Sequence, residues 1–384
     1  MIRRVLFFFI FLMAIALAVG SYLVPKKVDQ GTNQVVPHDP YQVSEEAKAL
    51  HASLRIVDLH SDTLLWKRDP LNRHAYGHMD LPRLKEGNVK LQVFSATTKS
   101  PDGQNYASNA GDTDRITALV QVQAWPVRTW SSLFERAMYQ AQRLERVERK
   151  DADAFTYVKS RADLEAVLAG DKIGGLYLIE GAHPLEGNLD KLDQLYDAGL
   201  RIVGLQHFFD NKLGGSLHGL SGDGLSPFGR DVLRRAEAKF MIIDVAHSSE
   251  AVVRDVLAGA TRPIIVSHTG FFGACQTKRN IPDDLMKEIA DQGGLIGVGY
   301  WDGAVCDASP GGVAKSIAYG IDLVGVEHVA LGSDYDGATT VYFDTAELNA
   351  LTQALLDEGL DEDQIRAVMG ENAIRFFKDN LPTK

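Results

Sequence analysis

Histidine and carboxylate side chains occur in this chain at spacings that suit metal binding. The stretch Ile56–Leu64 contains His60 and Asp62, which are two positions apart. In an extended segment, residues two apart point to the same side, so this imidazole and this carboxylate can form two arms of one metal site. An isolated His-x-Asp pair is more often a solvated strand end than a metal site. Its meaning therefore depends on the rest of the chain.

Further polar residues follow short apolar runs later in the chain, and all but the last of them come directly after a run. They are Glu180, His207, His247, His268 and Asp334. Imidazole and carboxylate ligands without thiolates suit Zn²⁺ and do not exclude Mn²⁺, Co²⁺ or Fe²⁺. The candidate metal ligands are His60, Asp62, Glu180, His247 and His268. This set exceeds what one tetrahedral zinc ion takes from protein, so two metal ions that share a bridging carboxylate fit better. Six other histidines are expected to be ordinary polar residues: His51, His74, His78, His183, His218 and His328.

Eight apolar or β-branched runs would position these side chains, and most of them are separated by amphipathic segments of helical spacing. The runs are Ile56–Leu59, Lys90–Ala96, Ile173–Ile179, Leu200–Gln206, Met241–Ala246, Ile264–Ser267, Leu295–Gly299 and His328–Leu331. Strands that alternate with helices indicate a parallel sheet, and eight of them predict a closed (β/α)₈ barrel of the TIM type. The polar residues then lie at the carboxyl ends of six strands, where barrel enzymes hold their active sites. We expect a single catalytic domain over residues 44–384.

The longest departure from this alternation is Thr97–Ser160, between the second and third strands. It contains a polar loop, Pro101–Asp112, and a helical pattern through Ala137, Met138, Ala141, Leu144 and Val147. The apolar stripe of that pattern predicts packing rather than function. The segment is expected to cover or border the active face. Ser44–Ser53 is predicted to be a leading helix, and residues 344–379 are predicted to be helical.

The first residues have the pattern of an export segment. Arg3 and Arg4 precede a long apolar run. Residues 1–24 are therefore predicted to be a signal peptide, with Ala16–Ala18 as a candidate cleavage site, or an N-terminal membrane anchor. Residues 25–43 are polar and are predicted to be a linker. The barrel is then expected to be exported, periplasmic or extracellular, and to meet a membrane only through its N-terminal segment.

Composition and charge limit the classes of function. Of the 384 residues, 45% are hydrophobic and 24% are charged, as in a globular protein. The net charge of −11 argues against a nucleic-acid partner. In an exported chain, Cys275 and Cys306 could form one disulfide bond, but the sequence does not decide whether they meet. It also leaves open whether the protein forms a homodimer.

The ordered motifs resemble the membrane dipeptidase (renal dipeptidase) family of zinc peptidases, within the amidohydrolase superfamily of metal-dependent barrels. The resemblance covers about Ser44 to Phe377. It rests on His60-Ser61-Asp62, Glu180-Gly181, Gly204-Leu-Gln-His207, Asp244-Val-Ala-His247, Ser267-His268, Arg279-Asn-Ile-Pro-Asp-Asp284 and Asp334-Tyr-Asp-Gly337. Each motif is weak alone, but their order and strand positions make the set specific.

The resemblance implies a dipeptidase with two zinc ions. His60 and Asp62 would bind one ion, His247 and His268 would bind the other, and Glu180 would bridge them. A hydroxide between the two ions would attack the peptide carbonyl of a dipeptide substrate.

Three further residues would act on the substrate. By the resemblance, His207 would polarise the carbonyl and hold the oxyanion, Arg279 would bind the terminal carboxylate, and Asp334 would transfer the proton. The alternative for Arg279 is a surface ion pair with Asp283 or Asp284.

Two other functions stay open. One is a related amidohydrolase that acts on N-acyl amino acids or β-lactams. The other is a catalytically silent barrel used for binding, which the complete ligand set counts against. The stretch Gly299–Asp302 differs from the expected family pattern, and Thr97–Ser160 cannot be aligned with it. Both stretches are expected to border the substrate pocket, so the resemblance does not imply which substrate side chains are preferred.

Overall fold

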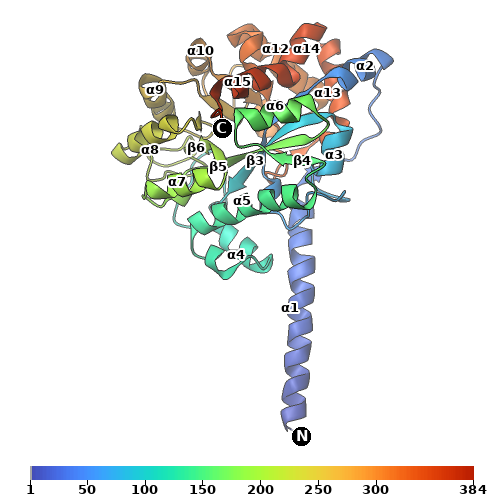
Figure 1. Cartoon of the computed structure of the whole chain (residues 1–384), viewed down its shortest axis with the longest axis vertical. Coiled ribbons are helices and arrows are strands. Elements are labelled where there is room, and N and C mark those ends of the chain that lie inside the picture. The colour runs from blue at the N-terminus through green and yellow to red at the C-terminus, as the bar shows by residue number, and fades with distance from the viewer. Residues whose placement is uncertain (1) are drawn as a thin grey trace.

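Parallel strands close into a barrel at the centre of the molecule (Figure 1). The computed structural model describes residues 2–384. The barrel strands are β2 (Ile56–Ser61), β3 (Val89–Thr97), β5 (Ile173–Glu180), β6 (Leu200–Gly204), β7 (Ile242–Asp244), β8 (Ile265–Thr269), β9 (Leu295–Val298) and β10 (Val329–Leu331). Each strand coincides with one of the predicted runs, so the predicted single-domain (β/α)₈ barrel is confirmed.

The strand register closes the barrel. The order around it is β3-β2-β10-β9-β8-β7-β6-β5, and β3 then pairs with β5 from Leu91 opposite Gly174 to Thr97 opposite Glu180. Every residue of β2 and β5 is buried, as expected for strands with helices outside and a packed interior inside. Because the strands are parallel, their carboxyl ends meet at one end of the barrel.

Helices surround the barrel (Figure 1). They are α3 (Leu81–Glu86), α6 (Arg161–Ala169), α7 (Asp190–Asp197), α8 (Pro227–Ala238), α9 (Glu250–Gly259), α10 (Asp283–Asp291), α11 (Asp302–Val305), α12 (Pro310–Val324), α13 (Leu348–Asp357), α14 (Glu362–Arg366) and α15 (Asn372–Asn380). Ser160, Ser226, Ser249 and Ser309 begin four of them, and each side chain accepts a hydrogen bond from the backbone three residues on. These caps satisfy backbone donors that the first helical turn leaves free. The predicted leading helix is α2 (Glu45–Ser53), which Ser44 caps in the same way.

The segment between β3 and β5 forms α4 (Arg115–Val122), α5 (Leu133–Lys150) and β4 (Phe155–Tyr157). The apolar stripe of α5 is buried, with Ala137 and Leu144 fully enclosed, and α5 packs on β3 and β5. The predicted packing role of this stripe is therefore confirmed. Strand β4 adds to the edge of β5 by parallel pairing.

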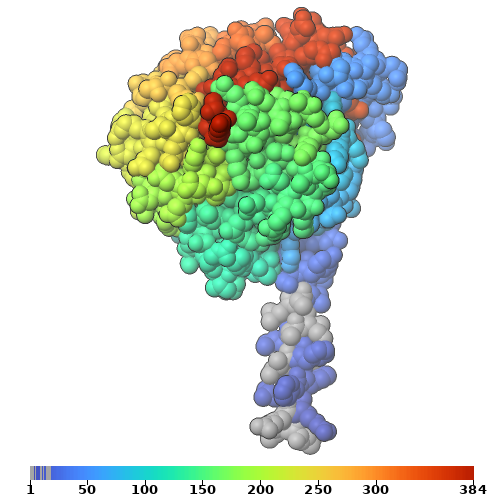
Figure 2. All heavy atoms as spheres, viewed as in Figure 1, coloured from blue at the N-terminus to red at the C-terminus, as the bar shows by residue number. Residues whose placement is uncertain are grey.

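The N-terminal segment is one long helix, α1 (Ile2–Thr32), which extends away from the barrel as a rod (Figures 1 and 2). The predicted linker is structured in part. Residues 25–32 continue α1, and β1 (Gln34–Val35) pairs in parallel with β11 (Thr340–Val341). Within the described part of the chain, no helix has both the length and the hydropathy of a membrane span. The choice between signal peptide and anchor stays a prediction.

Candidate active site

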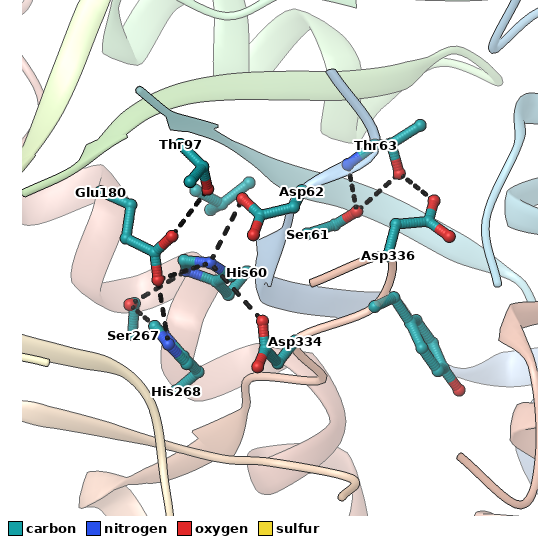
Figure 3. Close-up of polar contacts among 12 residues, drawn as sticks. His60, Ser61, Asp62, Thr63, Thr97, Glu180, Ser267, His268, Asp334 and Asp336 are labelled. Atoms are coloured by element: carbon teal, nitrogen blue, oxygen red, sulfur yellow. Dashed lines mark hydrogen bonds and ion pairs between the residues drawn. The ribbon is translucent and has the colours of Figure 1, made fainter. Parts of the chain in front are cut away.

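The carboxyl ends of the barrel strands bring the predicted site residues together, and Figure 3 shows His60, Asp62, Glu180, His268 and Asp334 among them. They comprise His60 in β2, Glu180 at the end of β5 and His268 in β8, with Asp62, His207, His247 and Asp334 in the residues just after β2, β6, β7 and β10. All of these side chains are buried. Arg279 lies in the loop between β8 and α10.

The carboxylate of Glu180 is the centre of the site. Its Oε1 lies 3.2 Å from Nε2 of His247, 3.4 Å from Nε2 of His268 and 3.7 Å from Nε2 of His60. Its Oε2 lies 3.3 Å from Nε2 of His207. A carboxylate whose two oxygens face imidazoles from four strands is placed to bridge two cations.

Two sets of ligand atoms share Glu180. Those of His60, Asp62 and Glu180 lie within 4.8 Å of one another, and so do those of Glu180, His207 and His247. His207 is thus as near to the centre as the predicted metal ligands. The Nε2 atoms of His247 and His268 are 3.0 Å apart.

Ser267 and Asp244 orient two of the histidines. The Ser267 hydroxyl donates to Oδ2 of Asp244 at 2.7 Å, and its oxygen lies 2.9 Å from Nδ1 of His268 and 3.3 Å from Nδ1 of His60. Because the hydroxyl proton is given to Asp244, both imidazoles must donate through Nδ1–H. Their Nε2 lone pairs then face Glu180, as metal binding requires. The sequence motifs include both residues but did not predict this role.

The chemistry of the donor atoms fits divalent cations. Nε2 of His60 and Oδ1 of Asp62 are buried and have no hydrogen-bond partner among the described residues. Burial lowers the pKa of His60 to about 4, so its ring is neutral at neutral pH. Burial and the charge of Glu180 raise the pKa of Asp62 well above its ordinary value, and burial and the charge of Asp62 do the same for Asp334. Neutral imidazoles beside crowded carboxylates are stabilised by metal ions of the kind that nitrogen and oxygen ligands bind.

The backbone turns sharply at two of these positions. His247 has φ +64° and Asp334 has φ +58°, in the left-handed region that side chains other than glycine rarely adopt. Such strain costs on the order of 1–3 kcal/mol per residue and collects at functional sites. Close by, a Cβ atom at Gly337 would lie 2.1 Å from Oδ1 of Asp334, so only glycine leaves room for that carboxylate.

Arg279 is completely buried beside the histidines. Its Nη2 donates to the carbonyl oxygen of His268 at 2.8 Å and lies 3.3 Å from Nε2 of His247. The alternative interpretation, a surface ion pair with Asp283 or Asp284, is wrong because the side chain has no exposed surface. Nη1 has no acceptor within the part of the chain that the structure describes, so it is free to donate a hydrogen bond to a carboxylate oxygen of a ligand.

A disulfide bond joins two loops around Arg279. The sequence left the pairing of Cys275 and Cys306 open, and the structure bonds them. Cys275 precedes Arg279, whose guanidinium carbon lies 5.2 Å from the centroid of the Trp301 ring. Trp301 donates through Nε1 to the Tyr106 hydroxyl at 2.8 Å, a contact between residues 195 positions apart. Both residues lie in stretches that were expected to border the substrate pocket, Thr97–Ser160 and Gly299–Asp302. Neither was predicted individually, because no local pattern marks such a distant contact.

A cavity of about 350 Å³ opens over the cluster. Asp62, Glu180, His207, Arg279 and Asp334 line it together with apolar side chains. Helix α4 also lines the cavity, so the prediction that the segment after β3 borders the active face is confirmed. The volume suits a small-molecule ligand.

Comparisons with known proteins agree with this geometry. Residues 44–382 match the family model described as Membrane dipeptidase (Peptidase family M19). The dipeptidase aclJ of Aspergillus oryzae is 27% identical over 351 residues, which cover 84% of this chain and 78% of that protein. The solved structure of dipeptidase AC, a metallopeptidase, aligns with a TM-score of 0.73 and 24% identity over 86% of this chain and 100% of that one.

A second solved structure is that of a Rhodobacter sphaeroides metallopeptidase liganded with a phosphinate mimic of the dipeptide L-Ala-D-Ala. It aligns with a TM-score of 0.69 and 22% identity over 85% of this chain and 99% of that one. The family model spans the whole barrel and every residue of the buried His and carboxylate cluster. This chain therefore belongs to the membrane dipeptidase family of metallopeptidases.

Proposed function

We propose that this protein is a zinc-dependent dipeptidase that uses two zinc ions bridged by Glu180. The observation that carries the proposal is the position of the Glu180 carboxylate, within 3.7 Å of four imidazole Nε2 atoms that come from β2 and β8 and from the residues after β6 and β7. His60 and Asp62 would hold one ion, and His247 and His268 the other. When bound, the ions would lower the pKa of a water molecule between them and so supply a hydroxide nucleophile.

His207 is proposed to stabilise the oxyanion. Its Nδ1 lies 3.3 Å from the carbonyl oxygen of Lys99, so this nitrogen carries a proton. Its Nε2 faces Glu180 and the cavity. Burial lowers the pKa of His207, and the charge of Glu180 opposes this shift. A proton gained at Nε2 would let His207 also donate to the carbonyl oxygen of the substrate.

Arg279 is proposed to bind the substrate, and Asp334 is proposed to transfer the proton. The free Nη1 of Arg279 and the planar shape of the guanidinium suit a terminal carboxylate, which would favour dipeptides over long chains. Asp334 borders the cavity with Oδ1 3.9 Å from Nε2 of His60. From there its carboxylate would accept the proton of the nucleophile and pass it to the departing amine.

Metal analysis combined with a substrate panel tests this proposal. The panel contains L,L-dipeptides, L-Ala-D-Ala, N-acyl amino acids and a β-lactam, each assayed with and without a chelator. We expect about two zinc ions per chain and hydrolysis of dipeptides that the chelator abolishes. Hydrolysis of the acyl compounds or the lactam alone would favour the related amidohydrolase. A protein that binds dipeptides without hydrolysing them would be a silent barrel.

We also propose that the protein is exported. Arg3 and Arg4 before an apolar run support this location, and so does the disulfide between Cys275 and Cys306, since disulfides persist in oxidising compartments. Cell fractionation with N-terminal sequencing of the recovered protein would test it. An N-terminus near residue 19 would indicate a cleaved signal peptide. An intact N-terminus in the membrane fraction would indicate an anchor, and recovery of the protein in the cytoplasm would contradict export.

A further inference from the structure

An apolar surface lines the same cavity as the metal-ligand cluster. We call it the apolar wall, and it consists of Val24, Pro25 and Val28 of α1, Leu65 and Trp66 after β2, and Ile116, Leu119 and Val122 of α4. Val24 and Val28 are 46% and 39% exposed. The groups proposed to hold the substrate backbone are all polar, so they do not account for this surface.

Packing fixes the α4 side of the wall. Leu65, Trp66 and Ile116 are buried in one small apolar cluster with Val120 and Trp125. Helix α4 is thereby held against the residues that follow β2, and α1 packs against α4 in turn.

A buried ion network fixes the α1 side. Asp29 accepts a hydrogen bond from Nε of Arg68 at 2.8 Å, and Nη2 of Arg68 lies 2.7 Å from Oδ1 of Asp336. Asn33 donates to Asp29 at 2.8 Å and accepts from the backbone N–H of Ala338 at 2.9 Å. Asp29, Arg68 and Asp336 are at most 3% exposed. The end of α1 is therefore attached to the loop that carries Asp334.

The wall lies toward one end of the proposed substrate. The wall is held in place by contacts with the residues that follow Asp62 and Asp334. Arg279 instead contacts His247 and His268, on another part of the site. A dipeptide with its carboxylate at Arg279 and its carbonyl carbon over Glu180 would extend its N-terminal residue toward Asp62 and Asp334. The side chain of that residue would then contact the apolar wall, which lines the same cavity.

We infer that the apolar wall is the specificity site for the N-terminal residue of the dipeptide and that it selects bulky apolar side chains. The inference rests on the proposed dipeptidase function. The α1 part of the wall precedes residues 44–382, which the family model matches, so it is an addition to the family barrel. It also follows the candidate cleavage site Ala16–Ala18, and so it stays with the barrel whether or not the export segment is removed.

Matched substitutions on α1 test the inference. The measured quantity is the ratio of kcat/KM for Leu-Ala to that for Ala-Ala, with Ala-Leu as the reversed dipeptide. We expect the kcat/KM of the wild type to be about tenfold or more higher for Leu-Ala than for Ala-Ala, because the extra carbon atoms of leucine add contacts in an apolar pocket. Val28→Asp should lower the ratio about tenfold, mainly through KM, because apolar contacts bind substrate and transition state alike. Val28→Thr keeps the shape, adds a hydroxyl group and should lower the ratio less.

Leu23→Asp is the matched control. It introduces the same charge on the same helix, at a side chain that is 45% exposed and lies outside the cavity lining, and should leave the ratio unchanged. A wild-type ratio near one, an unaltered ratio in Val28→Asp, or a loss confined to Ala-Leu would overturn the inference while the dipeptidase function stands. A wild-type protein that hydrolyses no dipeptide would overturn the proposed function and the inference with it.

Discussion

At the scale of single residues, Asp334 has the environment of a proton carrier. It is buried, has a raised pKa and borders the cavity without a neutralising cation in direct contact among the described residues. Asp334→Asn keeps the shape of the side chain but cannot accept the proton. We expect kcat to fall on the order of a hundredfold or more with the metal content nearly unchanged. Turnover assays and metal analysis of the same sample check this. Unchanged turnover would remove the proton role, whereas loss of metal would make Asp334 a ligand.

Arg279 provides a second test at this scale. Arg279→Lys keeps the positive charge but loses the planar fork, so KM for dipeptides should rise about tenfold or more, as expected for a charge-assisted hydrogen bond of about 1.5–3 kcal/mol. Arg254→Lys is the control, because Arg254 forms exposed ion pairs with Asp284 and Glu288. Dipeptide amides, which lack the carboxylate, should be affected much less than dipeptides. An equal rise in KM for both substrate types would contradict the carboxylate clamp.

The sequence predicts the reactive side chains better than the groups that orient them. His60, Glu180 and His268 could be predicted because each lies at a strand end, a position that the local apolar pattern reveals. Ser267 orients two imidazoles through a contact across the barrel, between residues 207 positions apart in one case. Tyr106 likewise reaches the site through a distant contact. Such contacts exist only after the barrel closes, so no local pattern contains them.

At the scale of elements, the ion pair between Asp29 and Arg68 is what attaches the end of α1. Asp29→Ala removes one of the two carboxylates around a buried guanidinium, which costs about 3 kcal/mol or more. We expect the amides of residues 24–35 to lose hydrogen-exchange protection, while the barrel strands keep theirs. Asp69→Ala, which removes an exposed ion pair with Lys150, is the control and should leave both regions protected.

Two outcomes of that exchange experiment would contradict the attachment. One is unchanged protection of residues 24–35 in Asp29→Ala. The other is an equal loss in the barrel strands, which would mean that the substitution destabilises the whole fold rather than one element.

The elements of the barrel were predictable, and the N-terminal ones were not. Each barrel strand is a compact apolar run, so its position is encoded locally. Residues 25–35 are polar and contain Pro25, which disfavours the interior of a helix. Their structure depends on Arg68, Asp336 and the pairing with Thr340–Val341, all distant in sequence. This segment, whose composition predicts a linker, therefore folds because the residues with which it interacts lie on the barrel.

At the scale of the whole molecule, closure of the barrel creates the site. Its histidine and carboxylate donors come from β2 and β5, from the residues after β6, β7 and β10, and from β8. Only β2 provides two of these ligands, His60 and, just after the strand, Asp62. Each of the other elements provides one, so none of them could bind a metal ion alone. The site and the fold are consequently coupled, and ions bound there stabilise the native state alone.

Metal removal should therefore lower thermal stability as well as activity. Each ion at a hundredfold excess over its Kd adds about 2.7 kcal/mol, so two ions add about 5 kcal/mol and should raise Tm by about 7 °C in a chain of this size. Removing them also leaves the carboxylates of Asp62 and Glu180 without a neutralising charge, and burial together with the charge of Glu180 raises the pKa of Asp62. Calorimetry of the chelated protein and of the same sample reloaded with zinc measures the shift. His268→Asn, which lacks one donor, should recover only part of it. Indistinguishable Tm values before and after chelation, in a protein shown to have lost its metal, would mean that the cluster does not bind metal tightly in the native state.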